Sequence, residues 1–377
     1  MVASSQAARE ERAISEIDRL GSAGLNGIDL LRRCVDVLQP VIPFDAWCAT
    51  TTDPGSNLIT DAITQRESGS QATHDAISDT YFSQVYFEHD YEQTLDMLRQ
   101  RQRVQRLSDA AGELTRSVRY QLHLAPRHLG AEVYATLVDR GLWGELHLTR
   151  EHGRADYTIH EVDFLNKVAP RIGSALKGAA FRAHASRVTE RDGFVAPGVL
   201  ILDRNGRVIS ATANVEGYLR EFSVLDAAWR SGHNLPIALQ VVLAALERTV
   251  SPQSRGGRHR VPRLRLRAQS GRWLTLDASL TEASDERPSE RVVVIGPAPS
   301  EDIAWLSLAA LQLSKREEDV IRQVVRGLST RQIADELFIT EHTVQRHLSN
   351  IFEKVGVRSR RELVKQLFFE QVLPSLN

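Results

Sequence analysis

The starts of short helices are marked clearly over residues 313–373. Three times a Ser is followed three residues later by Glu or Gln, the spacing of a capping box, in which two side chains satisfy free N–H groups of the first helical turn. Apolar residues at helical spacing follow each box, and Thr340 begins a further helix. The segment therefore predicts four helices, the second and third forming a helix-turn-helix. The boxes are Ser314 with Glu317, Ser329 with Gln332, and Ser359 with Glu362.

The third of these helices has an apolar and a polar side. Val344, Leu348 and Ile351 recur at spacings that place them together. The opposite side suits the major groove of DNA, where Gln pairs with adenine and Arg with guanine, at about 1–3 kcal/mol of discrimination each. We assign base readout to Gln345, Arg346, Ser349 and His342. We assign phosphate contacts to Thr340, Thr343, His347, Asn350 and Lys354.

An ordered set of residues runs through this segment: 313–317, 327–329, Ile333, Ala334, Leu337, Ile339, Thr343, Val344, His347, Lys354, Gly356, Val357, Ser359 and Arg360. The set resembles the LuxR-type helix-turn-helix. The resemblance implies a DNA-binding transcription regulator that dimerises, often through its fourth helix. One position departs from the family, because the residue after Val344 is commonly lysine there and is Gln345 here. The sequence of the DNA site therefore stays open. A helical bundle without DNA binding is the alternative, and the ordered matches argue against it.

Length and composition limit what the whole chain can be. The 377 residues predict two or three domains at roughly 150 residues each. A formal net charge of −1 excludes a protein that grips nucleic acid over its whole surface, but not one with a single basic face. Two cysteines cannot form a disulfide framework. Because we find neither a signal peptide nor an apolar run near about 18 residues, we expect a cytoplasmic protein without membrane contact.

Residues 21–187 predict a sensory domain of mixed helix and strand, preceded by a tail or helix over 1–20. The expected helices are 28–39, most of 72–125 and 158–187, and the expected strands are 44–51, 131–138 and 142–148. Residues 143–148, 157–165 and 172–176 resemble the closing strand and helix of a GAF domain. The GAF family implies a module that holds a small ligand or mediates dimerisation.

Residues 190–298 predict a second sensory domain. A hairpin joins 199–202 to 207–210 through Asn205-Gly206, which supplies the positive φ angles of a tight turn. Further strands are expected at 263–268, 273–280 and 292–295, with a helix at 236–247. Residues 198–209 with Asn214, Tyr218 and Leu219 are similar to the opening of a PAS domain. The expected fold is thus α+β and multidomain: GAF-like and PAS-like antiparallel sheets, then an all-α four-helix helix-turn-helix domain over 311–377.

Aromatic residues of the first domain either line an effector pocket or fill its core. The pocket candidates are Trp47, Tyr81, Phe82, Tyr86 and Trp143. Cys34 and Cys48 fit core packing better than a redox pair. His147 and His152 have no Cys or carboxylate set at metal spacing, so we expect no metal and no cofactor.

Two patterns allow more than one interpretation. Arg263, Arg265 and Arg267 lie in an arginine-rich stretch, 254–272, and share one strand face, which is either solvated or turned to an acidic partner or phosphate. The helix over 158–187 has an apolar side at near-heptad spacing, which either packs on its own domain or pairs with a second chain. Its residues are Val162, Leu165, Ala169, Ile172, Leu176 and Ala179.

Together these patterns predict a one-component transcription regulator and not an enzyme. Its sensory domains respond to a small effector and control a homodimer that binds double-stranded DNA. The alternative keeps the DNA-binding domain and replaces the small effector by a protein partner. A third interpretation, a thiol reductase, would have to use Cys34 and Cys48.

Overall fold

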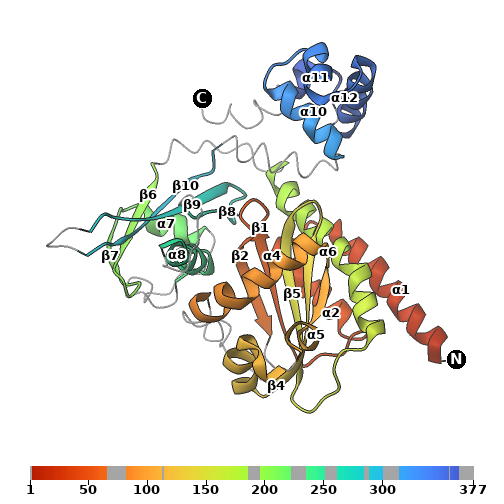
Figure 1. The fold of residues 1–377 in the computed structure, drawn as a ribbon, viewed down its shortest axis with the longest axis vertical. Coiled ribbons are helices and arrows are strands. Elements are labelled where there is room, and N and C mark those ends of the chain that lie inside the picture. Colours follow the sequence, from red (N-terminus) through yellow and green to blue (C-terminus); the bar gives the residue numbers. More distant parts are fainter. Residues whose placement is uncertain are drawn as a thin grey trace. The chain divides into compact units, whose positions relative to one another are not determined.

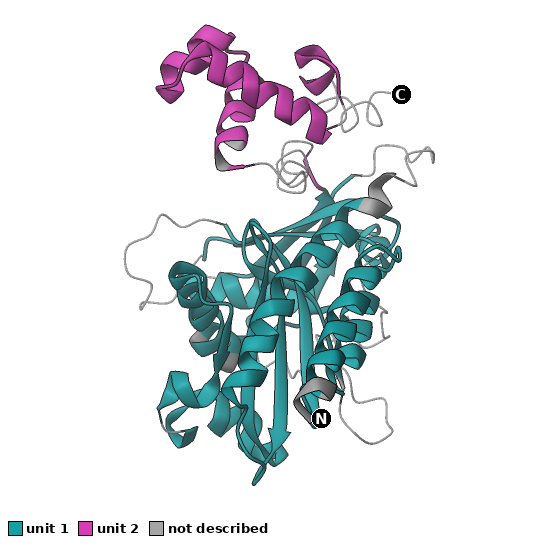
Figure 2. Cartoon of the chain, turned by 90° about the vertical axis from the view of Figure 1, so that its right-hand side faces the viewer, with its two compact units in different colours: residues 1–184, 196–297 teal, residues 185–195, 298–377 magenta. Residues whose placement is uncertain are grey.

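The computed structural model describes residues 2–65, 82–112, 114–185, 196–221, 235–250, 261–283, 288–299, 314–355 and 357–364. The chain divides into two compact units (Figure 2). Unit 1 comprises residues 1–184 and 196–297, and unit 2 comprises residues 185–195 and 298–377. The described part of unit 1 holds two five-stranded sheets, whereas that of unit 2 is helical. The expected order of antiparallel sheets followed by a helical domain is confirmed.

The first sheet has the strand order β2-β1-β5-β4-β3, and all its pairs are antiparallel. Its strands are β1 (Ala46–Asp53), β2 (Leu58–Gln65), β3 (Val104–Arg106), β4 (Leu129–Val138) and β5 (Leu142–Glu151). Successive residues of a strand point to opposite faces. Along β4, Val133, Ala135 and Leu137 enter the first hydrophobic core, and the residues between them face the other way.

Three helices take part in this core: α1 (Val2–Gly21), α2 (Gly27–Leu38) and α6 (Ile159–Ala185) (Figure 1). Asn26 caps α2 by accepting a hydrogen bond from the Asp29 N–H at 2.9 Å. The apolar face of α2 then buries Leu31, Val35 and Leu38. Helix α1 confirms that residues 1–20 include a helix.

The apolar side of α6 packs on its own sheet. Leu165, Ala169 and Ile172 are at most 1% exposed, and all three belong to the first core. Gly173 brings the helix so close that a Cβ there would lie 2.8 Å from the backbone carbon of Leu137 on β4. The hypothesis of a two-chain seam along this side is therefore wrong, because the side chains that would form it are already buried within one chain.

Short helical elements cover the opposite face of the first sheet. They are η1 (Phe82–Asp90), α4 (Tyr91–Gln100), α5 (Leu107–Ala111), η2 (Leu114–Arg116), η3 (Tyr120–Leu124) and η4 (Ala125–Arg127). Both η1 and η3 are π-helical. The expectation that 72–125 is mostly helical is confirmed for its described part, apart from the short strand β3, while residues 72–81 lie outside the described ranges.

The second sheet has the strand order β7-β6-β10-β9-β8. When the strands of each sheet are numbered along the chain, both sheets have the same order, 2-1-5-4-3. Its strands are β6 (Gly198–Leu202), β7 (Val208–Ala211), β8 (Arg263–Arg267), β9 (Trp273–Leu280) and β10 (Arg291–Pro297). Helices α7 (Val215–Arg220) and α8 (Ile237–Val250) contribute to its core. Leu58, Ile59 and three aromatic residues of η1 also enter this core, so the two halves of unit 1 share packing.

Two local features differ from the sequence-based expectation. Strand β2 was not predicted, because Leu58–Gln65 mixes Thr, Asp and Gln with only scattered apolar residues. In the β6–β7 turn only Gly206 has a positive φ, of 79°, whereas Asn205 does not. The turn does not need a second left-handed residue, because the Asp203 carboxylate stabilises it. This carboxylate accepts hydrogen bonds from the Asn205 and Arg207 N–H groups at 2.8 and 2.9 Å.

Unit 2 contains α10 (Lys315–Val325), α11 (Thr330–Leu337) and α12 (Glu341–Val355), followed by helical residues 360–364. The capping boxes at Ser314 and Ser329 form with both reciprocal bonds. At the third box Ser359 accepts from the Glu362 N–H, but the Glu362 carboxylate bonds to the Arg358 N–H instead of the cap residue. The predicted remainder of the fourth helix, 365–373, lies outside the described residues.

Candidate nucleic-acid interface and a buried polar cluster

The two sides of α12 separate as its helical spacing predicts. Val344, Leu348 and Ile351 are buried in the core of unit 2. The side chains assigned to base readout are all exposed on the other side: Gln345, Arg346, Ser349 and His342. Helix α12 of the helix-turn-helix thus presents a continuous polar surface, which is the arrangement that a recognition helix requires.

The residues assigned to phosphate contacts lie around this surface. Thr340 caps α12, since its hydroxyl accepts from the Thr343 N–H at 3.2 Å and lies 2.9 Å from the Thr343 hydroxyl. Thr340 and Asn350 are exposed, whereas Thr343 and His347 are half-buried. The hydroxyl of Thr340 therefore stabilises the start of the helix in addition to any contact with DNA.

Lys354 has a partner within the chain. Its ammonium lies 2.7 Å from a carboxylate oxygen of Glu317, which is 2% exposed and belongs to the capping box of α10. Burial favours a raised pKa for Glu317, but hydrogen bonds from Lys354 and from the Ser314 N–H outweigh it, and the pKa is lowered. Lys354 thus ties α12 to α10, a role that the assignment to phosphate did not foresee.

The exposed face of α12 on a capped helix pair defines a helix-turn-helix DNA-binding protein. Residues 311–367 match the family model described as bacterial regulatory proteins, luxR family. The spore germination protein GerE of Bacillus subtilis is 46% identical over 55 residues, which cover 15% of this chain and 74% of GerE. The chain belongs to the LuxR family of transcription regulators.

Other similar proteins either match only this segment or have low sequence identity to the chain. The nitrate/nitrite response regulator homolog of Haemophilus influenzae is 49% identical over 59 residues, 16% of this chain and 28% of that protein. Among solved structures, a VqmA–ligand–DNA complex from Vibrio cholera is 16% identical, covers 48% of this chain and 85% of that chain, and has a TM-score of 0.26. This score is too low for the complex to indicate how the present chain is arranged.

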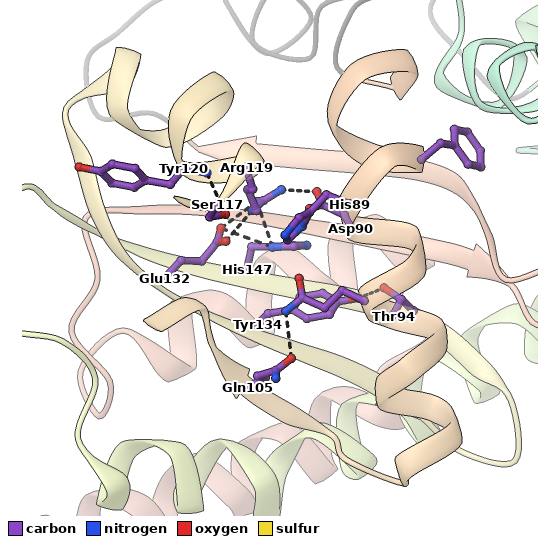
Figure 3. Close-up of polar contacts among 12 residues, drawn as sticks. His89, Asp90, Thr94, Gln105, Ser117, Arg119, Tyr120, Glu132, Tyr134 and His147 are labelled. Atoms are coloured by element: carbon purple, nitrogen blue, oxygen red, sulfur yellow. Dashed lines mark hydrogen bonds and ion pairs between the residues drawn. The ribbon is translucent and has the colours of Figure 1, made fainter. Parts of the chain in front are cut away.

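A cluster of charged and polar side chains is buried in unit 1, between β4, β5 and the elements that cover them (Figure 3). Its centre is Arg119, which is 3% exposed. The guanidinium holds Glu132 through two hydrogen bonds of 2.5 and 2.8 Å, pairs with Asp90, and donates to His147 Nδ1 at 3.1 Å. Burial favours raised pKa values for both carboxyls, but the charge of Arg119 together with the charges and hydrogen bonds of neighbouring histidines outweighs it, and both pKa values are lowered.

A second group of the cluster contains hydroxyls and one carboxylate. The Thr94 hydroxyl on α4 bonds to the Tyr134 hydroxyl and donates to Glu145 at 3.0 Å. Burial raises the pKa of Glu145, which is 2% exposed. Burial likewise raises the pKa of Tyr134. These polar residues were not predicted as a site, although strict alternation of polar residues along 132–136 and 145–149 was a signal that could have found them.

The aromatic pocket candidates are not brought together. Trp47 and Trp143 belong to the first core, and Phe82 and Tyr86 belong to the second. Tyr81 lies outside the described residues. The pocket assigned to these five residues remains a prediction, and the buried polar cluster is the stronger candidate for an effector site in the described chain.

The cysteines fit the packing interpretation. Cys34 is buried in the first core and Cys48 is half-buried on β1, and both thiols are free. Burial raises the pKa of each to about 12. Within the described ranges, no group of three or more His, Cys, Asp and Glu suits a metal ion. None of the described helices has the length and apolarity that crossing a membrane requires.

The arginines of β8 bind partners inside unit 1. Arg263 lies 2.6 Å from Asp277, Arg265 donates its backbone N–H to Asp53 at 3.1 Å, and Arg267 donates to the carbonyls of Ala179 and Ala180 on α6 at 3.2 and 2.8 Å. The interpretation of this face as simply solvated is therefore wrong for Arg265 and Arg267, which are half-buried, whereas Arg263 is exposed. Arg255, Arg258 and Arg260 lie outside the described ranges.

Proposed function

We propose that this protein is a one-component transcription regulator in which unit 1 senses a small effector and unit 2 binds DNA as part of a homodimer. The observation that carries the proposal is the exposed polar face of α12 within a LuxR-family helix-turn-helix. Gln345, Arg346, Ser349 and His342 read bases in the major groove. Thr340, Thr343, His347, Asn350 and Lys354 contact phosphates, with Lys354 also holding α12 in place.

The sensory part comprises a GAF-like domain over 21–187 and a PAS-like domain over 190–298. Two antiparallel sheets with the same strand order support this division, and their shared packing supports a joint response. The protein acts on chromosomal DNA in the cytoplasm. Effector binding shifts the population of dimers whose α12 helices match two half-sites about 34–36 Å apart.

An effector that is itself a protein finds less support. That alternative relied on the arginine-rich strand as a docking surface for an acidic partner. Arg265 and Arg267 instead bind Asp53 and the carbonyls of α6. A small effector in unit 1 is therefore the proposal that we retain.

DNA binding is tested by fluorescence anisotropy with the full chain and DNA from upstream of its own gene. We expect an affinity that falls steeply with salt, since phosphate contacts release counterions. Arg346→Ala should reduce discrimination at one base pair by about 1–3 kcal/mol. Arg322→Ala is the matched control, because it removes an equal charge from the exposed surface of α10. Equal effects of both variants on base preference would contradict the role of Arg346.

A further inference from the structure

One face of the first sheet is polar although it is buried. Cross-strand pairing aligns Thr50 with Glu145 and Glu145 with Thr136, and it aligns Cys48, His147 and Tyr134 in the next row. Residues directly opposite each other on neighbouring strands project to the same face. Thr50, Glu145 and Thr136 are at most 3% exposed. An antiparallel sheet face that is covered is normally apolar, and the polar groups of this one need hydrogen-bonding partners.

Most charges of the cluster are matched within it. Asp90 and Glu132 share Arg119, and His147 lies 3.4 Å from Glu132. The third buried carboxylate, Glu145, differs from the other two. The Thr94 hydroxyl donates to it at 3.0 Å and in turn bonds to the Tyr134 hydroxyl, and neither hydroxyl carries a positive charge. Among the described residues, no arginine or lysine side chain hydrogen-bonds Glu145, and the charge that acts on it comes from His147.

Thr50 supplies an independent observation. Its hydroxyl is buried and has no hydrogen-bond partner among the described residues. Because Thr50 is paired in register with Glu145, the hydroxyl and the carboxylate project from neighbouring strands to the same side. A buried polar group without a partner destabilises the fold, and a ligand that bonds to it would remove that cost.

We propose that Glu145 and Thr50 form the binding site for a small organic cation with several N–H donors, such as an amine or a guanidine. The proposal rests on the proposed sensory function of unit 1 and names the chemistry of its effector. The positive charge neutralises the Glu145 carboxylate, and further N–H groups donate to Glu145 and to the Thr50 hydroxyl. A planar guanidinium suits a carboxylate best, because two parallel N–H groups can bind its two oxygens.

The elements over this site connect it to the rest of unit 1. The π-helical elements η1 and η3 flank the residues of the cluster, and π-helical turns often mark functional sites. Phe82, Tyr86 and Phe87 of η1 pack in the core of the second sheet. Arg248 of α8 donates to the Phe87 carbonyl at 2.7 Å and pairs with Glu92 on α4. A cation that draws α4 and η1 towards Glu145 would thereby also move contacts of the second sheet.

The test uses calorimetric titration of the full chain with methylguanidinium chloride and with N-methylurea, a neutral molecule of nearly the same shape. We expect binding of methylguanidinium and no measurable binding of N-methylurea. Binding of neither probe, or equal binding of both, would overturn the proposal.

Three variants locate the site. Glu145→Gln keeps the shape and removes the charge, and should weaken methylguanidinium binding at least about tenfold. Thr50→Val replaces the hydroxyl by a methyl group and should weaken it about three- to tenfold. Asp96→Asn removes an equal charge from the exposed surface of α4 and should leave it unchanged. Wild-type affinity in both of the first two variants would refute the assignment.

DNA binding of the same preparations, measured without either probe, separates this proposal from the proposed function. Retained DNA binding without methylguanidinium binding overturns the cation site alone. Methylguanidinium binding in a chain that binds no DNA supports the site and contradicts the regulator.

Discussion

Arg119 allows two carboxylates to remain ionised inside unit 1. Removing one partner of a buried ion pair costs about 3–5 kcal/mol, because the remaining charge stays buried and unpaired. We therefore expect Arg119→Met to lower the free energy of unfolding by about that amount at neutral pH, measured by urea denaturation. Arg103→Met, on the exposed surface, is the control and should change it by less than about 0.5 kcal/mol.

The same variant has a defined pH dependence. The folded-state pKa values of Asp90 and Glu132 are lowered, so their pairing stabilises the protein above the unfolded pKa of about 4 and loses this effect as the pH falls. The deficit of Arg119→Met should therefore be fully present at neutral pH and should shrink as the pH falls below about 4. A deficit that stays constant with pH would show that the lost contribution is packing and not charge.

The two cysteines should be chemically inert in the folded protein. Their pKa values of about 12 leave only about one thiol in ten thousand ionised near pH 8, and the thiolate is the reactive form. We expect no alkylation by iodoacetamide under native conditions and complete alkylation of Cys34 and Cys48 in urea, measured by intact mass. Rapid native labelling of either residue would revive the thiol-enzyme hypothesis.

At the scale of elements, two helical glycines predict opposite effects of the same substitution. A Cβ at Gly173 of α6 would meet the backbone of β4 at 2.8–2.9 Å, whereas one at Gly217 of α7 would meet no described atom within 4 Å. Gly173→Ala should destabilise unit 1 by about 1–3 kcal/mol. Gly217→Ala should stabilise it by about 0.5–1 kcal/mol, since alanine favours the helix. Urea denaturation measures both, and a stable Gly173→Ala variant would refute the close approach of α6 to the sheet.

The pair between Lys354 and Glu317 tests how α12 is held on α10. We expect Lys354→Met to lower the stability of unit 2 as well as its affinity for DNA. A double-mutant cycle with Glu317→Gln should give a coupling energy of about 1–3 kcal/mol in thermal unfolding. A coupling near zero, together with weaker binding to all DNA sequences, would restore the interpretation of Lys354 as a phosphate contact alone.

Individual elements differed in how far their residues predicted them. Helices α10 and α11 were predicted to within a residue or two, because their capping boxes act within one helical turn. Strand β2 was missed because its stability comes from pairing with β1, which aligns seven residue pairs with a register shift between Thr51 and Thr52. The local sequence of β2 carries little of that information.

At the scale of the molecule, arginines connect the two halves of unit 1. Arg265 bonds to Asp53 of the first sheet, and Arg267 bonds to the carbonyls of α6. We expect the slowest-exchanging amides of β5 and β9 to report the same opening free energy by hydrogen exchange. In the double variant Arg265→Met, Arg267→Met these two values should separate. Equal values in the variant would show that the shared apolar core suffices to couple the sheets.

The sequence alone determined unit 2: its helix starts, the two sides of α12 and its family follow from residues three or four positions apart, where helical geometry acts directly. Tertiary structure decided the rest. It placed the apolar side of α6 against its own sheet, gave the arginines of β8 partners within the chain, and gathered Arg119, Glu132 and Glu145 into one buried cluster. Those outcomes depend on which distant segments meet in space, and the pattern within each segment is compatible with several partners.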